Sequence, residues 1–370
     1  MASPRLRPIA TRIAIPMAGL ALLAAALTAS STVAHARSVT YRANPTNPLV
    51  GVQWGVYKGG QDGAYPAFES SSGTERALLA KVALQPRARW YGSWIPTRDI
   101  RAKVHSEIAA EQADARNPNV MVPMALFRQF PGHERDKGIP WSAADQQNYR
   151  DWYNAVARGI GKAHALIILE PDLPVALKGW RPDIRLRLVN YAARTLAALP
   201  NTVIYIDGGA SDWLKPYQQA ALLKAAGVAH VRGFALDGTH YTPTSDNIRD
   251  GRAVVAALAR HGIPGKHFVI DTSDNGAGFT FGEYYAKHPN GFFANAEPCQ
   301  TKAEHRCVTL GIPPTTQVAE PAWHFSARVD DIAKRWVDAF VWYNRPWLTN
   351  ATWPFDLRRT LQVARTTPFQ

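Results

Sequence analysis

The stretch ALIILEPDLP, residues 165–174, contains four consecutive apolar residues (166–169) that run directly into Glu170, Pro171 and Asp172. A continuous apolar run, without alternating polar residues, is typical of a strand that is covered on both faces, as in a parallel sheet. The proline fixes the turn between the two acids. The stretch therefore predicts a buried strand whose carboxyl end carries two carboxylates.

Further runs of the same kind recur along the chain, and helical patterns separate most of them. They cover residues 50–56, 88–94, 119–127, 202–207, 231–237, 267–273 and 338–344. Strand–helix alternation repeated this often favours an α/β barrel or a doubly wound sheet. In either architecture, functional sites gather at the carboxyl ends of the strands.

The helical patterns show typical start and stop residues. Helices are expected over residues 143–162, 183–199, 217–227 and 250–262. Asp183 is expected to cap the second helix, because its side chain can accept a hydrogen bond from a free backbone N–H. Gly227 and Gly262 are expected to end the last two.

The first 36 residues have the features of a secretory signal peptide. Arg5, Arg7 and Arg12 form a positive segment, residues 13–27 are apolar, and AHA (34–36) is a small-residue cleavage site. A membrane anchor is the alternative, but the apolar run is short for a membrane span. We therefore expect a secreted or periplasmic protein with a single domain over residues 37–370, and no membrane association after cleavage.

The charge balance is basic but dispersed. The formal net charge of the 370-residue chain is +13, and removing the three signal-peptide arginines, with no acid, leaves +10. No dense Lys/Arg run is present, so we expect a solvated surface and no nucleic-acid partner. The twelve tryptophans exceed what a core alone needs, and flat Trp surfaces suit sugar rings. We expect a monomer that binds a polysaccharide or oligosaccharide.

Cys299 and Cys307 are the only cysteines in the sequence. In an oxidising compartment they can form one disulfide that closes a loop; two free thiols are the alternative. A zinc site would need more ligands than His305, which is the only histidine between them. No metal or cofactor is expected, although a site built from Asp residues stays open as an alternative.

Five acids lie at or shortly after strand ends and therefore at one rim of the expected fold. They are Asp136, Asp172, Asp207, Asp237 and Asp271. Clustered carboxylates raise one another's pKa values, which lets one of them stay protonated as a general acid. Such a group beside aromatic residues indicates glycoside hydrolysis. Trp90 and Trp213 are candidate sugar platforms, and Trp94 is expected to pack in the core.

Five motifs in the same order resemble glycoside hydrolase family 6, which comprises cellobiohydrolases and endoglucanases acting on β-1,4-glucan. They are ILEPD (168–172), YIDGGASDWL (205–214), RGFALDGTHY (232–241), IDTSDNG (270–276) and DAFVWYNRP (338–346). The resemblance extends over residues 54–350. It implies a distorted α/β barrel of mostly parallel strands and an exported hydrolase that inverts the anomeric centre.

The resemblance also assigns roles to single residues. Asp172 matches the general acid, Asp136 of PGHERDKG (131–138) matches an acid that supports it and the water, and Asp207 matches a structural or water-network position. Substrate contacts are expected from Trp90, Trp213, His240 and Trp342. For His240, a hydrogen-bonded loop histidine is the alternative.

The chain departs from the family pattern at several sugar-binding positions. Asn350 stands at the position of the family base, Asn344 and Leu348 replace a Lys and a Glu, and other departures are Lys137, Ala210, His240, Asp274 and Arg306. A neutral amide cannot take a proton from water. Three interpretations follow: an active enzyme whose base is displaced, for example to Asp356, or relayed through Asp136; an enzyme with a shifted substrate; or a polysaccharide-binding relative without turnover.

Overall fold

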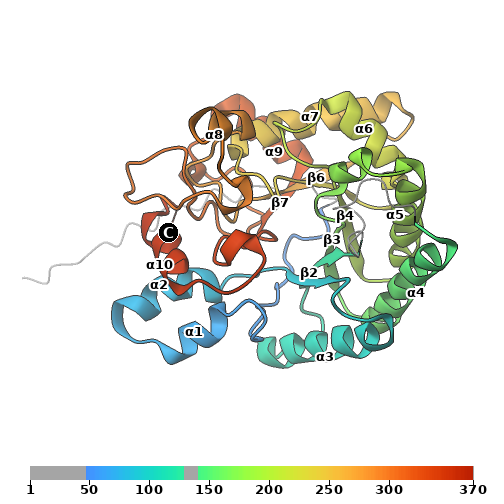
Figure 1. Cartoon of the computed structure of the whole chain (residues 1–370), viewed down its shortest axis with the longest axis horizontal. Coiled ribbons are helices and arrows are strands. Elements are labelled where there is room, and N and C mark those ends of the chain that lie inside the picture. The colour runs from blue at the N-terminus through green and yellow to red at the C-terminus, as the bar shows by residue number, and fades with distance from the viewer. Residues whose placement is uncertain (1–46, 129–140, 370) are drawn as a thin grey trace, which may run out of the picture. The chain divides into compact units, whose positions relative to one another are not determined.

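A single parallel sheet lies at the centre of the computed structural model, which describes residues 47–128 and 141–369 (Figure 1). Its strands follow chain order: β1 (Arg89–Gly92), β2 (Val122–Phe127), β3 (Ala165–Leu169), β4 (Thr202–Asp207), β5 (Gly233–Leu236), β6 (His267–Asp271) and β7 (Val337–Val341). All neighbours pair in parallel. The two edges approach where the Ala88 N–H donates a 2.8 Å hydrogen bond to the Trp342 carbonyl. The predicted distorted α/β barrel is thus confirmed.

Both faces of the strands are apolar because both are covered. In β3, Leu166 and Ile168 point into the barrel interior, where they join a cluster with Tyr205 of β4. Ile167 and Leu169 alternate with them and belong to the cluster formed with the surrounding helices. This double burial explains the unbroken apolar run, since neither side of the strand meets water.

Helices form an arc around the outside of the sheet (Figure 1). The arc contains α3 (Thr97–Ala115), α4 (Ala143–Ile160), α5 (Pro182–Ala197), α6 (Pro216–Ala225), α7 (Thr244–Arg260) and α9 (Ala327–Trp336). The other α-helices are α1 (Ala64–Ser70), α2 (Gly73–Ala83), α8 (Phe281–Lys287) and α10 (Leu357–Thr366). Short 3-10 helices are η1 (Leu173–Lys178), η2 (Val228–His230), η3 (Phe293–Asn295), η4 (Pro321–Trp323) and η5 (Thr349–Ala351). The predicted stop residues Gly227 and Gly262 have positive φ angles of 91° and 78°.

Two local predictions were wrong. Residues 50–56 form no strand: residues 48–51 are a turn, Gly51 has a φ of 75°, and only Trp54 makes a bridge, to Met121. Asp183 does not cap α5, because the helix begins one residue earlier with Pro182, and Arg181 is the cap residue. Asp183 instead accepts 2.8 Å hydrogen bonds from Arg181 and Arg187.

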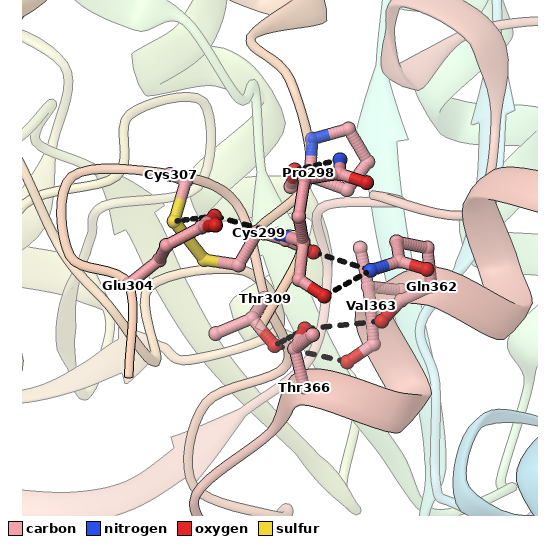
Figure 2. Close-up of a disulfide and its surroundings, with 9 residues drawn as sticks. Pro298, Cys299, Glu304, Cys307, Thr309, Gln362, Val363 and Thr366 are labelled. Carbon is pink, nitrogen blue, oxygen red and sulfur yellow. Dashed lines mark hydrogen bonds between the residues drawn. A yellow bond between two sulfur atoms is a disulfide. The ribbon is translucent and has the colours of Figure 1, made fainter. Parts of the chain in front are cut away.

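A long connection, residues 272–326, joins β6 to α9 and contains the disulfide (Figure 2). Cys299 and Cys307 are bonded to each other, as predicted. The Gln362 side chain of α10 donates a 2.6 Å hydrogen bond to the Cys299 carbonyl, and the Thr309 hydroxyl donates a 2.9 Å bond to the Val363 carbonyl. The closed loop is therefore fastened to α10.

No helix within residues 47–128 and 141–369 is long and apolar enough to cross a membrane. The predicted signal peptide, residues 1–36, lies outside the described residues.

Candidate active site

A cavity of about 740 Å³ opens at the carboxyl ends of the strands. Its lining residues come from β1, from the end of β2, and from the segments that follow β1, β3, β5, β6 and β7, with Gln61 from the segment before α1. Its lining includes Gln61, Trp90, Trp94, Phe127, Asp172, Thr239, His240, Tyr241, Phe292, Ala294, Asn344, Arg345, Asn350, Ala351, Thr352 and Trp353. The cavity mixes aromatic faces with amides and a single carboxylate among the described lining residues, a composition that suits a sugar chain.

Asp172 is that carboxylate. It follows β3 by three residues, and its backbone adopts the left-handed conformation with a φ of 65°. For a non-glycine residue this conformation costs on the order of 1–3 kcal/mol and is concentrated at functional sites. Burial raises the pKa of Asp172, while a 2.6 Å hydrogen bond from the Thr239 hydroxyl and the charge of His240 act in the opposite direction. A raised pKa is what a proton donor requires.

Glu170, two residues earlier, has a different environment. It is fully buried, and its carboxylate accepts hydrogen bonds from the Tyr149 and Tyr153 hydroxyls at 2.6 and 2.7 Å. The backbone N–H of Arg128 donates a further bond of 3.1 Å. These partners anchor the end of β3 to β2 and α4, so Glu170 holds the segment from which Asp172 projects.

The other strand-end acids that the structure describes are buried among local hydrogen-bond donors. Asp207 accepts a 2.8 Å bond from the Gly209 N–H and a 3.1 Å bond from the Tyr343 hydroxyl. Burial, followed by the charge of Asp172, raises the pKa of Asp207 well above its usual range. Gly209 has a φ of 87°, which only glycine adopts without strain, so the tight turn over Asp207 depends on it.

Asp237 and Asp271 likewise organise the loops that follow their strands. Asp237 accepts a 2.6 Å bond from the Thr242 hydroxyl and a 2.9 Å bond from the Asn275 amide. Asp271 accepts the backbone N–H groups of Tyr343 and Asn344 at 2.6 and 2.7 Å. Burial nevertheless raises the pKa of Asp271 to about 6. The cluster of acids is real, but within the described residues only Asp172 among them lines the cavity.

Trp90 lines the cavity, but one of its faces is already covered. The guanidinium carbon of Arg345 lies 4.0 Å from the centroid of the Trp90 ring. The indole N–H of Trp90 donates a 2.5 Å hydrogen bond to the Tyr343 carbonyl, and its ring packs edge-on against Phe127 at 5.5 Å. Trp90 is therefore held rigidly, with Arg345 on a face that a sugar ring could otherwise use.

His240 combines the two alternatives left open by the sequence. Its ring lines the cavity, and its Nδ1 lies 2.7 Å from Oδ1 of Asp212. The ring stacks on Trp213, with centroids 4.7 Å apart and an interplanar angle of 18°. Trp213 itself is not part of the cavity lining. In this structure His240 presents the aromatic surface to the cavity, and Trp213 supports it from behind.

A sequence model of the family described as glycosyl hydrolases family 6 matches residues 56–346. The chain belongs to this family. Endoglucanase A of Cellulomonas fimi is 33% identical over 215 residues, an alignment that covers 58% of this chain and 45% of that protein. This chain thus aligns with about half the length of that relative.

Solved family 6 structures match nearly the whole fold. The endoglucanase Cel6 from Mycobacterium tuberculosis, in complex with methyl-cellobiosyl-4-deoxy-4-thio-β-D-cellobioside, has a TM-score of 0.66 and 27% identity, covering 86% of this chain and 99% of that one. The catalytic core domain of the cellobiohydrolase Cel6A from Chaetomium thermophilum has a TM-score of 0.62 at 18% identity, covering 87% and 98%. The second similarity supports the fold alone.

Besides Trp213, two further tryptophans do not lie where the sequence analysis put them. Trp342 is 1% exposed, donates its indole N–H to the Ile312 carbonyl at 2.9 Å, and packs with Trp347 in a core cluster outside the cavity lining. The expectation that it contacts substrate is therefore wrong for this structure. Trp94, expected in the core, is 51% exposed and lines the cavity. Whether each tryptophan packs in the core or lines the cavity depends on its burial, which the local sequence does not reveal.

Asn350, which the sequence resemblance places at the position of the family base, lies at the cavity. Asn350 lies in η5 with a φ of 53°, lines the cavity, and donates its backbone N–H to the Asn295 side chain at 3.2 Å. Asp356 caps α10, where it accepts the Arg359 N–H at 2.9 Å, and it is not among the lining residues. Asp136 falls outside the described residues.

The sequence analysis missed part of the cavity wall of this family 6 chain. Phe292 and Trp353, 59% and 65% exposed, stand at the cavity beside Trp94. Both come from irregular segments whose sequence has no periodicity, so the only available signal was an aromatic residue in a loop. No group of three or more His, Cys, Asp or Glu side chains arranged to hold a metal ion occurs within residues 47–128 and 141–369.

Proposed function

We propose that this chain is an exported glycoside hydrolase that cleaves β-1,4-glucan by inversion, with Asp172 as the proton donor. The observation that carries the proposal is the environment of Asp172: a carboxyl group with a burial-raised pKa that lines the aromatic cavity of a family 6 fold. The predicted signal peptide at residues 1–36 supports export.

The proposed chemistry follows from the positions of the side chains. Protonated Asp172 gives its proton to the glycosidic oxygen as the bond to the anomeric carbon breaks. A water molecule attacks the opposite face of the sugar ring, which requires a space of about 6.5–9.5 Å between the acid and the group that receives the water's proton. Trp94, His240 and Phe292 supply aromatic surface along the cavity for neighbouring sugar units.

A second candidate function rests on Asn350. Because this amide cannot act as a base, and Asp356 is engaged as a helix cap, the described cavity contains the donor without a carboxylate partner. Turnover would then depend on a water relay, for which Asp136 is the candidate. Without such a relay, the chain is a catalytically impaired or substrate-shifted protein that binds polysaccharide.

An assay of reducing-end release distinguishes the two functions. The wild type is incubated with soluble β-1,4 and mixed-linkage glucans, alongside Asp172→Asn and Trp94→Ala. A hydrolase releases reducing ends, and Asp172→Asn abolishes the release. A binding protein releases none, yet it is retained on the glucan in a form that survives Asp172→Asn and weakens in Trp94→Ala. Neither release nor retention on any β-glucan contradicts both functions.

A further inference from the structure

Arg345 is a cation without a matching acid in the cavity. It follows β7 and lines the cavity, and its guanidinium lies flat on Trp90. Its Nε is buried and has no hydrogen-bond partner. Among the described residues, no Asp or Glu forms an ion pair with Arg345. Leaving a buried guanidinium donor unpaired is costly, so this arrangement needs a ligand to complete it.

The surroundings of Arg345 do not neutralise its charge. The charge of Asp62 acts on Arg345 and raises its pKa, but the Asp62 carboxylate already forms a 3.0 Å ion pair with Arg87. Arg89 acts on Arg345 with the same sign of charge. Burial is the largest effect and lowers the pKa of Arg345 to about 9. An anion bound beside the guanidinium would relieve this penalty.

No other ionisable group that lines the described cavity balances the positive charge of Arg345. Among the described lining residues, Asp172, His240, Tyr241 and Arg345 carry such groups. Burial raises the pKa of Tyr241, so its hydroxyl group stays neutral. His240 is paired with Asp212, and Asp172 is neutral in its proton-donating form. Asn344, which lies next to Arg345, donates its amide to Asp274 at 2.5 Å and adds no charge. A ligand in this cavity is therefore in contact with a lining that is neutral except for the positive charge of Arg345.

The geometry of Arg345 further defines the ligand. The guanidinium is planar and presents parallel N–H donors that match both oxygens of a carboxylate. Because it covers a Trp90 face, a sugar ring cannot stack there without displacing it. A sugar that carries a carboxylate can instead lie in the plane of the guanidinium and bind it edge to edge. The side chains of Gln61 and Asn344 line the same cavity.

We infer that the cavity selects β-1,4-glucan chains bearing carboxylate groups, that is, chains with uronic acid units, and that Arg345 is the residue that recognises the carboxylate. This inference rests on the proposed function, since it names the substrate class of the same cavity. The inference predicts that the preferred substrate is an acidic chain, although the proposed reaction is the same as for a neutral β-1,4-glucan.

The test compares two soluble chains of equal length: a β-1,4-gluco-oligosaccharide and its C6-oxidised form, in which glucuronate replaces glucose. Isothermal titration calorimetry measures Kd with the mature Asp172→Asn protein, which prevents turnover. Arg345→Gln, Arg345→Lys and Arg260→Gln are made in that background. Arg260 is an exposed arginine at the end of α7, and α7 precedes β6, so this control removes the same charge at the opposite ends of the strands.

The expected result is that the acidic chain binds at least tenfold more tightly than the neutral one at low salt, since a hydrogen-bonded charge pair contributes about that factor or more. Arg345→Gln removes the preference and keeps neutral binding, Arg345→Lys keeps part of the preference, and Arg260→Gln keeps all of it. Equal binding of the two chains, or a preference that survives Arg345→Gln, overturns the inference and leaves the proposed function intact.

Two remaining outcomes are also decisive. Absence of binding to either chain overturns the inference together with the proposed function. If Arg345→Gln binds neither chain, the Lys variant decides: a retained preference for the acidic chain supports the inference, and neutral binding without that preference overturns it.

Discussion

The hydroxyl group of Thr239 donates a 2.6 Å hydrogen bond to Oδ1 of Asp172, joining the loop after β5 to the acid after β3. This bond favours the charged carboxylate and so lowers the pKa of Asp172, while burial raises it more strongly. The two effects together set the pH range over which a donor at this position keeps its proton.

Thr239→Val removes the hydrogen bond while keeping the side-chain shape. Because the charged form loses a stabilising donor, the pKa of Asp172 rises. A proton donor acts only below its pKa, so the basic limb of kcat/KM moves to higher pH. The measurement is a pH profile of glucan hydrolysis. Thr352→Val, which alters another cavity threonine, is the control and leaves the limb in place. An unchanged limb in Thr239→Val argues against Asp172 as the donor.

Asn350→Asp places a carboxylate at the position that the sequence resemblance assigns to the family base. General-base catalysis typically contributes 10²–10⁴-fold, so kcat is expected to rise by a factor on the order of 100. The measurement is initial-rate kinetics on a soluble β-glucan. Adding Asp172→Asn to this variant is expected to return the rate to background. If Asn350→Asp has the wild-type rate, the proton acceptor lies elsewhere, as in a relay through Asp136.

Glu111 predicts a pH dependence of stability that is independent of catalysis. It lies in α3, is 3% exposed, and both of its carboxylate oxygens lack hydrogen-bond partners. Burial raises its pKa to about 8, despite the charge of Arg87. Between the unfolded pKa, near 4.5, and about 8, the native state binds a proton that the unfolded state does not. Stability contributed by this group therefore falls as pH rises, by up to about 1.4 kcal/mol per pH unit.

Glu111→Gln is expected to flatten that decline, and the measurement is the free energy of unfolding in urea at a series of pH values from 4 to 9. Little difference from the wild type in slope is expected below pH 4.5, where both states are protonated. Glu75→Gln makes the same change of side chain at an exposed position of α2 and serves as the control. A slope in Glu111→Gln equal to that of the wild type contradicts the assigned burial of this carboxyl.

The disulfide gives a prediction about stability. Cys299 and Cys307 are eight residues apart, so the bond restricts a short loop of the unfolded chain. In the chain-entropy account this contributes about 2–3 kcal/mol. Replacing both cysteines by serine is expected to lower the free energy of unfolding by that amount under oxidising conditions. Reducing agent should weaken the wild type and leave the double variant unaffected. A double variant as stable as the oxidised wild type contradicts the prediction.

The sequence predicted a parallel sheet because its strands are buried on both faces, and Leu166 to Leu169 show that burial in their composition. The resemblance to family 6 favoured the barrel over a doubly wound sheet. It failed at residues 50–56, where the apolar pattern resembles a strand but Gly51 turns the chain. Asp172 could be found because it follows a strand end and a proline.

Arg345, Phe292 and Trp353 could not be found in the same way. Their roles depend on where irregular segments bring them in space, and no local periodicity records that position. Trp342 shows the opposite case, because it was expected at the cavity and is buried in the core. The local sequence around a core tryptophan does not differ from that around a tryptophan that lines a cavity.

The most direct test of the central claim is a proton NMR time course of the anomeric signals released from a soluble β-1,4-glucan by the wild type and by Asp172→Asn. Inversion with Asp172 as the donor predicts that the α-anomer appears first in the wild type and that Asp172→Asn gives no early product. Initial release of the β-anomer, or unchanged release by Asp172→Asn, would contradict the account.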